Sequence, residues 1–363
     1  MLSSSVTGCD NVPMTALFAG LTTLDVLHRL DHVPDPSLKV TSTDFTMAAG
    51  GPATNAAVTY AALCAASRSL SFDEAEAASG AALPSGEAPT LLTALGEGPV
   101  SAFLAADLAA AGVRVLDATV PALSPAEKAS KRGSAPASSL ASREPAVSSI
   151  IEHPSGRMVA STNARLDANA EQIASDLPER VGAVLIDGHN PTLAHAALTL
   201  GVPDVDEDDP FALLEARPPH PRILDGGSWK DWLTALLGFV DIAVVSEDFA
   251  PPLMEHPDGA QVADFLRGFG IARTVRTRGD RSVQYWWDDA SGEVCVDAVR
   301  DASTLGAGDA FHGAFAWGIE RGGDADPERL IRFASAVAAV AVSSFGTRQW
   351  LASPALAELV RGW

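Results

Sequence analysis

A glycine-rich turn followed by an acidic residue is the part of the chain best suited to chemistry. Its sequence is Ser303-Thr304-Leu305-Gly306-Ala307-Gly308-Asp309, and an apolar stretch follows over residues 310–319. A Gly-Ala-Gly turn that opens a helix leaves backbone N–H groups without partners at the positive end of the helix dipole, where an anion binds. A carboxylate beside that anion is useful as the group that takes a proton from an attacking hydroxyl, so the turn indicates phosphoryl transfer to an alcohol.

Two common nucleotide-binding patterns do not fit this turn. Phe311 occupies the position of the third glycine of a dinucleotide-binding fingerprint, and no GxxxxGK[ST] sequence occurs in the chain. A GxG turn at a helix start is common and often only links two elements. The functional interpretation therefore needs a second motif.

That second motif is Gly50-Gly51-Pro52-Ala53-Thr54-Asn55, which precedes a predicted helix running to about residue 66. The two glycines let the backbone approach a ligand closely, and the Asn55 amide can both donate to and accept from sugar hydroxyls. Asp25 follows a predicted buried strand at residues 17–20, and ligands of open α/β sheets bind beyond such strand ends. The structural alternatives are a helix-start asparagine and a solvated loop aspartate.

In this order and at these separations, the three segments resemble the ribokinase-like (pfkB) carbohydrate kinases, whose signatures are a GG-x-x-x-N region and a DTxGAGD region. The resemblance runs from about residue 16 to residue 347. Residues 304–309 are most similar to the ketohexokinase branch, and residues 20–57, with Lys39, to the bacterial sulfofructose kinase branch. The resemblance implies a ribokinase-like three-layer α/β/α sandwich with a mainly parallel central sheet and a small β-sheet lid.

The resemblance also implies an ATP- and Mg²⁺-dependent kinase that acts on a small-molecule sugar, and it assigns roles to residues. Asp309 is the general base, and Gly306, Ala307 and Gly308 supply the N–H groups of an anion hole. The sugar-binding positions are Asp25, Gly50, Gly51, Asn55 and Lys39, and the nucleotide-binding positions are Ser246, Thr277, Gly279, Ser335 and Ala339.

Two positions depart from the family pattern. Phe249 stands where many members carry the glutamate of an Asn-x-x-Glu motif, which leaves Glu247 or Asp248 to contact a metal through water. Ser303 replaces the first aspartate of DTxGAGD. Dependence on K⁺ therefore stays open, although Asp301 is two residues away.

Several alternatives remain for the function. A ketose or similar furanose is the first choice of acceptor; Lys39 and Arg157 would suit a phosphorylated or sulfonated sugar, and a nucleoside is third. A non-catalytic sugar or nucleotide sensor is favoured by the two departures and opposed by the intact turn. A pyridoxal-type vitamin kinase shares the fold, but the Gly50-Gly51 pair and the lid pattern favour a sugar kinase.

The alternation of strand and helix patterns predicts one α/β domain over residues 14–363, because 363 residues with 47% hydrophobic content can bury one large core. Alternating apolar and polar residues predict lid strands at about 25–48 and 145–162. Residues 1–13 are predicted to be flexible, and inserted loops are predicted at about 67–89, 124–142 and 202–220. Helices are expected at 100–111, 191–200, 229–237, 261–269, 309–320 and 327–343, and further strands at 91–95, 183–187, 223–225, 242–246 and 274–277.

Composition restricts the partners. A formal net charge of -21 argues against nucleic-acid binding and against docking to anionic membranes, since both need a basic surface. The 3 cysteines are far apart and show no CxxC pairing, which is typical of a reducing compartment. No secretory signal precedes the predicted domain, so a cytoplasmic location is expected. The resemblance adds an expected homodimer through the lid.

Overall fold

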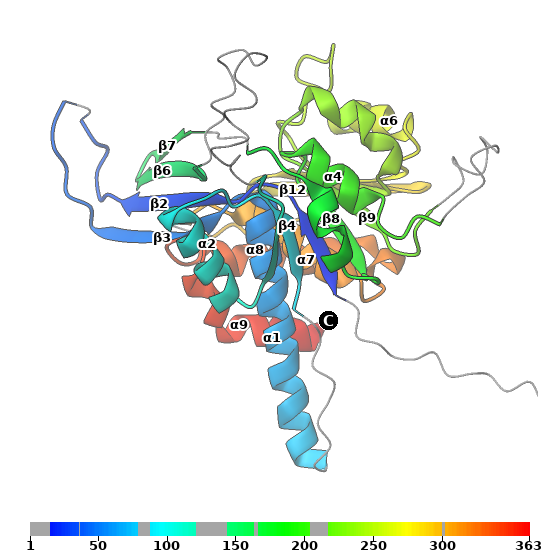
Figure 1. Cartoon of the computed structure of the whole chain (residues 1–363), viewed down its shortest axis with the longest axis horizontal. Coiled ribbons are helices and arrows are strands. Elements are labelled where there is room, and N and C mark those ends of the chain that lie inside the picture. The colour runs from blue at the N-terminus through cyan, green and yellow to red at the C-terminus, as the bar shows by residue number, and fades with distance from the viewer. Residues whose placement is uncertain are drawn as a thin grey trace, which may run out of the picture.

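A nine-stranded sheet runs through the middle of the protein, in the order β13-β12-β11-β10-β9-β8-β1-β4-β5 (Figure 1). The computed structural model describes residues 15–35, 37–78, 88–120, 144–162, 166–203, 217–299 and 302–363. Of residues 71–78 it describes the backbone alone. Seven neighbouring strands are parallel: β1 (Ala16–Ala19), β4 (Thr90–Thr93), β5 (Arg114–Asp117), β8 (Ala183–Ile186), β9 (Arg222–Gly226), β10 (Ile242–Ser246) and β11 (Arg273–Arg278). The hairpin of β12 (Arg281–Trp287) and β13 (Ala290–Val294) adds an antiparallel edge.

Helices cover both faces of this sheet, so its strands are apolar on both sides. Neighbouring residues divide between two cores: Phe18 packs with the first set of helices and Leu17 with the second. The first set is α1 (Pro52–Ala78), α2 (Pro99–Ala110), α7 (Ala307–Ile319), α8 (Pro327–Val342) and α9 (Pro354–Gly362), and the second contains α4 (Pro191–Leu198) and α6 (Gly259–Arg267). The expected three-layer sandwich is confirmed.

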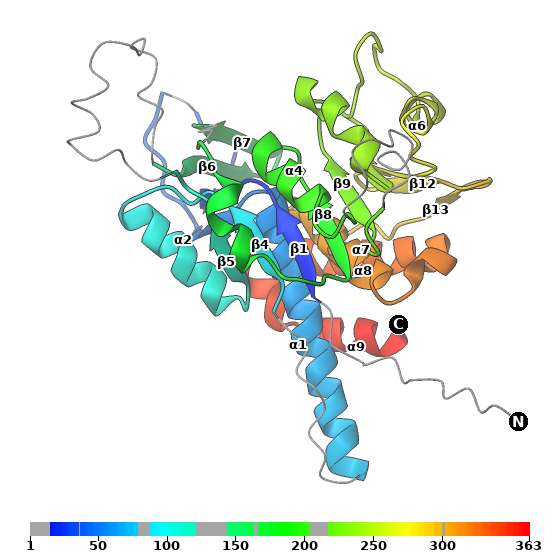
Figure 2. The ribbon, with the colours of Figure 1, turned by 45° about the vertical axis from the view of Figure 1, so that its right-hand side comes forward.

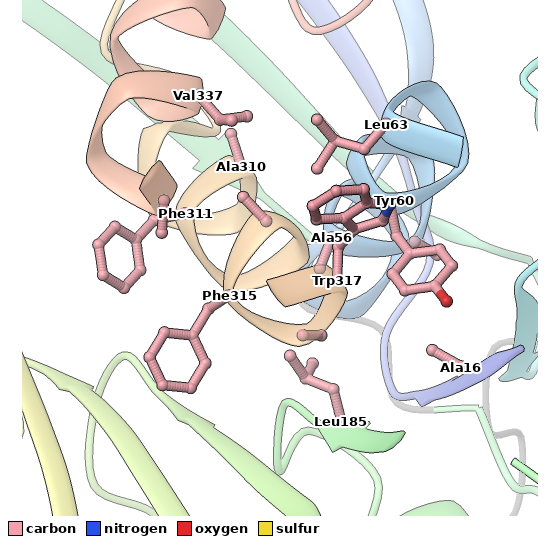
Figure 3. Packing of buried hydrophobic residues seen from close by; sticks show 14 of the residues in the cluster. Ala16, Ala56, Tyr60, Leu63, Leu185, Ala310, Phe311, Phe315, Trp317 and Val337 are labelled. Atoms are coloured by element: carbon pink, nitrogen blue, oxygen red, sulfur yellow. The ribbon is translucent and has the colours of Figure 1, made fainter. Parts of the chain in front are cut away.

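The glycine turn of the sequence opens α7, which lies in the middle of the first core. Figure 3 shows Trp317 of α7 near Tyr60 of α1, and Phe315 on the opposite side of α7; both belong to the same core as the sheet residue Leu185. All residues from Ala310 to Ile319 are buried, so the first turn of α7 is fixed by a helix that is packed on every side.

A second, smaller sheet lies beside the large one, in the order β3-β2-β6-β7 (Figures 1 and 2). Its strands are β2 (Thr23–Arg29), β3 (Asp44–Gly50), β6 (Ala146–His153) and β7 (Gly156–Ser161), and we call it the lid sheet. Its inner face packs through Leu27 and Ile150 on Phe345 and Leu305. Its outer face carries Phe45, Met47 and Met158, whose side chains are exposed.

Three expectations about elements are corrected. Helix α1 continues to Ala78, so the first part of the loop expected at 67–89 is helical, because Ala and Glu are strong helix formers. The helix expected at 229–237 is instead two short 3₁₀ segments, η2 (Asp231–Ala235) and η3 (Leu237–Phe239). The β12–β13 hairpin was not predicted, although Val283, Tyr285 and Trp287 alternate as a half-buried strand does.

The other segments of regular structure are short 3₁₀ turns: η1 (Ala170–Asp176), η4 (Gly323–Ala325) and η5 (Gln349–Ala352). The expected flexible residues 1–13 and the loop at 124–142 lie outside the described residues, as do 79–87 and 204–216 of the other two loops. Among the helices that are described, none combines the length and apolar character needed to cross a bilayer.

We predict that Gly313→Ala destabilises the protein. Helices α7 and α1 approach closely at Gly313, where a Cβ would meet the Ala56 carbonyl oxygen and lie 2.7 Å from Thr59 Cβ. Overpacking of this kind costs about 1–3 kcal/mol, so Tm should fall by several degrees in thermal unfolding. Gly308→Ala on the same helix is the control, because nothing lies within 4 Å of its added Cβ. Equal Tm values for the two variants would contradict the prediction.

Candidate functional site

The N-terminus of α7 is shaped to leave backbone donors exposed. Gly306 is its N-cap residue with φ 76, a left-handed conformation that favours glycine, and no described side chain caps the first turn. The Ala310 N–H donates to the Gly306 carbonyl at 2.8 Å, so regular helix bonding begins there. The Ala307 N–H makes a long bond of 3.4 Å to the Thr304 carbonyl, whereas the N–H groups of Gly308 and Asp309 have no described backbone acceptor before the helix and can donate to an anion there.

The N-terminus of α1, which carries Asn55, is anchored to the central sheet by a buried carboxylate. Asp187 follows β8 and accepts from the backbone N–H groups of Leu21 at 2.9 Å and Ala53 at 3.2 Å. Burial alone would raise the pKa of Asp187, but the adjacent His189 and these hydrogen bonds hold it below its ordinary value. The carboxylate is therefore charged and stabilises the positive end of α1.

The inner face of the lid sheet presents three rows of side chains, which follow from the strand register. Asp25 lies opposite Ser148 and Ser148 opposite Ser161; Leu27, Ile150 and Val159 form the next row; Arg29, Glu152 and Arg157 form the third. Because side chains alternate across a strand, these rows share one face. The first row is polar, the second is apolar and the third is charged.

A cavity of about 270 Å³, which we call the smaller cavity, lies between this face of the lid, α1 and the α7 turn. Asp25, Asn55 and Asp309 line it together with Gly51, although they come from distant parts of the chain. The Asn55 Nδ2 donates to Asp309 Oδ2 at 2.8 Å, while the buried Asn55 Oδ1 has no hydrogen-bond partner. That amide oxygen is therefore free to accept a hydrogen bond from a ligand hydroxyl.

The two carboxyl groups of this cavity are both displaced towards their neutral forms. Burial raises the pKa of Asp25, against the hydrogen bonds from Thr23 and Ser148. Burial raises the pKa of Asp309 to about 7, and the nearby charge of Asp225 acts in the same direction. A carboxylate with a pKa near neutrality is suited to exchange a proton at physiological pH.

Asp225 and His312 lie behind Asp309. The two side chains are 3.4 Å apart, and the His312 ring nitrogens also approach the carbonyl oxygens of Gly308 at 2.7 Å and Val244 at 3.1 Å. Burial raises the pKa of Asp225, with the His312 charge opposing it. His312 is thus a buried helix residue that links the turn of α7 to the sheet.

A larger cavity, of about 680 Å³, lies on the other side of the same turn. Ala307 and Gly308 line it, whereas Asp309 and Leu305 line the smaller one. All of the positions expected to bind nucleotide are among its lining residues: Ser246, Thr277, Gly279, Ser335 and Ala339. The buried Ser335 Oγ has no hydrogen-bond partner, so it offers a polar contact beside Ala338 and Ala339 in the wall of this cavity.

The expected metal contacts, Glu247 and Asp248, also line the larger cavity, and Glu247 pairs with Arg281. Phe249 is fully buried and packs against Trp229, so the position of the missing motif glutamate belongs to the core. Within the described ranges, no group of three His, Cys, Asp or Glu side chains could hold a metal ion alone.

Two of the positions expected to bind sugar, Lys39 and Gly50, line neither cavity. Lys39 lies in the connection between β2 and β3, where its side chain is exposed, and it lines neither cavity. Gly50 lines neither cavity, but a Cβ there would overlap the Asp25 carboxyl group. Gly50 thus makes room for a side chain of the site, and Lys39 is solvated because its connection extends beyond the sheet.

Sequence reasoning gave no role to Asp187 and Asp225. Asp187 directly follows the apolar strand β8, and Asp225 lies near the end of the buried strand β9. The rule for strand ends that singles out Asp25 could therefore have found both. The position of Arg157 depends on the register of β7, which the sequence does not reveal.

Comparisons of sequence identify the family. The family model described as pfkB family carbohydrate kinase matches residues 160–353, a range that includes the α7 turn. No curated protein sequence matches the chain significantly.

Solved structures with the same fold cover nearly the whole chain. A putative ribokinase from Agrobacterium tumefaciens superimposes with a TM-score of 0.67 at 22% identity, covering 97% of this chain and 99% of its own. An Arabidopsis thaliana ribokinase, solved with ribose and ATP, gives 0.59 at 16% identity, covering 96% and 99%. An adenosine kinase from Sinorhizobium meliloti gives 0.61 at 15% identity, covering 97% and 99%. With its helix-covered parallel sheet, lid sheet and matching C-terminal half, this chain belongs to the pfkB family of carbohydrate kinases.

Proposed function

We propose that this chain is an ATP-dependent sugar kinase in which Asp309 is the general base. The observation that carries the proposal is the place of the α7 turn between two cavities. Asp309 faces the smaller one and the adjacent Ala307 and Gly308 face the larger one. A phosphoryl group held at the N-terminus of α7 would therefore lie next to both its donor and its acceptor.

The smaller cavity suits a sugar. Its volume of about 270 Å³ matches a small ligand better than an extended one, and its polar groups are those that bind hydroxyls. The Asn55 Oδ1 without a partner and the Asp25 carboxyl group can accept hydrogen bonds from neighbouring hydroxyls.

The larger cavity suits a nucleotide. Ala338 and Ala339 leave space for a flat ring, and the Ser335 Oγ without a partner could bond to it. The Arabidopsis ribokinase was solved with ribose and ATP, and the same pair of ligands fits two cavities that meet at one turn. ATP is therefore our choice of phosphoryl donor.

In the proposed reaction, an acceptor hydroxyl in the smaller cavity gives its proton to Asp309 as its oxygen attacks the terminal phosphorus. The bond from that phosphorus to the oxygen that bridges it to the β-phosphate breaks, and ADP leaves. The N–H groups of Gly306, Ala307 and Gly308 stabilise charge on the transferring group. Asn55 holds Asp309 in place through its 2.8 Å hydrogen bond.

Mg²⁺ would neutralise phosphate oxygens in this reaction. The carboxylates of Glu247 and Asp248 line the larger cavity and are suitable oxygen ligands, directly or through water. Dependence on K⁺ is not part of the proposal, because the Ser303 hydroxyl already donates to Glu152 at 2.6 Å.

A neutral ketose or similar furanose is the proposed acceptor. Lys39, the residue that favoured an anionic sugar, is exposed and lines neither cavity. Arg157 does line the smaller cavity, so phosphorylated and sulfonated sugars belong in the same test, with nucleosides.

We also propose a homodimer that forms through the outer face of the lid sheet. Phe45, Met47 and Met158 are 51%, 44% and 55% exposed there. Covering such side chains with a second copy would remove apolar surface from water.

We predict that the protein releases ADP from ATP and Mg²⁺ in the presence of one class of sugar, and that Asp309→Asn lowers kcat by roughly 10²–10⁴-fold. The assay is a panel of neutral ketoses, aldoses, sugar phosphates, sugar sulfonates and nucleosides, with and without K⁺. The folded-state pKa of Asp309 lies above its unfolded value of 3.8, so folding stability falls as the pH rises from about 4 to about 7, and the full cost of ionising Asp309 is present at pH 8. The Asn variant should therefore have an equal or higher Tm at pH 8. Near-normal turnover by a folded variant would refute the role of Asp309, and an inactive wild type across the panel would refute the kinase.

We predict that kcat/KM rises with pH through about 7 and levels off above it, because Asp309 must lose its proton before it can act as a base. An ordinary aspartate would give a flat profile above about pH 5. The measurement is initial rate against pH at low acceptor concentration, with coupling enzymes in excess. A flat profile between pH 5.5 and 8.5 would contradict a raised pKa at the base.

We predict that the protein sediments as a dimer and that Met158→Asp shifts it to the monomer, because a charge on the outer face of the lid opposes burial there. Analytical ultracentrifugation over a range of concentrations measures this. Val33→Asp is the control, since Val33 is exposed but lies outside the lid strands. A monomeric wild type at micromolar concentrations would argue against the dimer.

A further inference from the structure

Arg157 is the one residue, among those described, that lines both cavities, and no other Lys or Arg is among their lining residues. We propose that Arg157 is a further catalytic residue, whose guanidinium binds the phosphoryl group while it passes from nucleotide to acceptor. The inference rests on the proposed function, because it concerns the same transfer.

The lid hairpin brings Arg157 to the turn through two neighbouring contacts. Arg157 lies opposite Glu152 across β6 and β7. Glu152 is buried and accepts from Ser303 Oγ at 2.6 Å, while Arg157 Nη1 donates to Thr304 Oγ1 at 3.2 Å. The consecutive residues Ser303 and Thr304 are thus bonded by two inner-face residues of the lid that lie opposite each other on β6 and β7. The guanidinium has its place beside the turn because the backbone of the hairpin is fixed there.

The charges around the turn create a need for this cation. Glu247, Asp248, Asp280 and Asp297 line the larger cavity, and Asp25 and Asp309 line the smaller one. With a formal net charge of -21, the chain as a whole also repels phosphate. Among the described residues that line the cavities, Arg157 is the cation that opposes this repulsion. The positive end of the α7 dipole acts in the same direction.

The chemistry of a guanidinium fits this position. As the terminal phosphorus leaves the bridging oxygen and bonds to the acceptor oxygen, negative charge is shared among oxygens on both sides of the turn. Arg carries five N–H donors in a planar fork, and the bond to Thr304 uses one of them. The remaining donors can bind two phosphoryl oxygens at once, and Asp309 receives the hydroxyl proton, so no further reactant is needed.

The test compares Arg157→Ala, Arg157→Lys and Arg114→Ala with the wild type, using the best acceptor of the panel. Arg114 is exposed, lines neither cavity and bonds to the Asp176 carbonyl, so its loss controls for the change in net charge. We expect Arg157→Ala to lower kcat by about 10²–10³-fold, with the acceptor KM changed by less than about threefold and Tm unchanged. Arg157→Lys should recover part of kcat, since it restores charge without the planar fork. Added guanidinium ion at millimolar concentration should partly restore turnover by Arg157→Ala, which a merely structural role would not allow.

Three results would overturn the inference. One is an Arg157→Ala kcat within about threefold of that of Arg114→Ala. Another is a loss confined to the KM of a phosphorylated or sulfonated sugar, because Arg157 would then bind the acceptor. The third is a wild type that neither turns over any acceptor nor binds a non-hydrolysable ATP analogue in calorimetry, which would also remove the proposed function. An active wild type with an unaffected Arg157→Ala variant separates failure of this inference from failure of the kinase.

Discussion

The site depends on a helix that begins without a side-chain cap. Gly306 takes a left-handed conformation at the N-terminus of α7, and the N–H groups of Gly308 and Asp309 after it stay available. Burial of the rest of α7 in the core fixes the direction of these donors, so their arrangement does not have to form when an anion arrives. A loop with the same residues would lose that organisation.

Carboxylates are concentrated at the same edge, and this imposes a constraint. The charge of Asp187 raises the pKa of Asp225, the charge of Asp225 raises the pKa of Asp309, and burial makes every charge there more costly. The structure divides them by environment. Asp187 is held charged by backbone donors at the start of α1, whereas Asp225 and Asp309 are shifted towards the neutral form. One fold therefore supplies both a carboxyl group with a lowered pKa and a carboxyl group with a pKa of about 7.

The lid sheet contributes to both cavities through its inner face, and its two faces differ. Side chains alternate along each strand, so one face receives Asp25, Ser148 and Arg157 and the other receives Phe45 and Met158. The inner face reaches the smaller cavity through Asp25 and the α7 turn through Arg157. A displacement of the lid would change both contacts together.

Local patterns in the chain were sufficient for the fold class, most elements of the central sheet and the two glycine motifs. The reason is that apolar strands buried on both faces, and glycines at positive φ, impose strong requirements on residue type over short distances. The same patterns placed Asp25, Asn55 and Asp309 near ligand-binding edges. They failed at residues 229–237 and 281–294, where tertiary packing decided between helix, 3₁₀ turn and edge strand.

Tertiary structure alone decided which distant residues meet. The bond between Asn55 and Asp309 joins residues 254 positions apart, and the shift of the Asp309 pKa comes from burial and from Asp225, which no local pattern reports. The exposure of Lys39 and the reach of Arg157 follow from how far a connection extends and how two strands pair. Residue types set what each side chain can do, whereas distances, desolvation and neighbouring charges exist only once the sheets and helices are packed together.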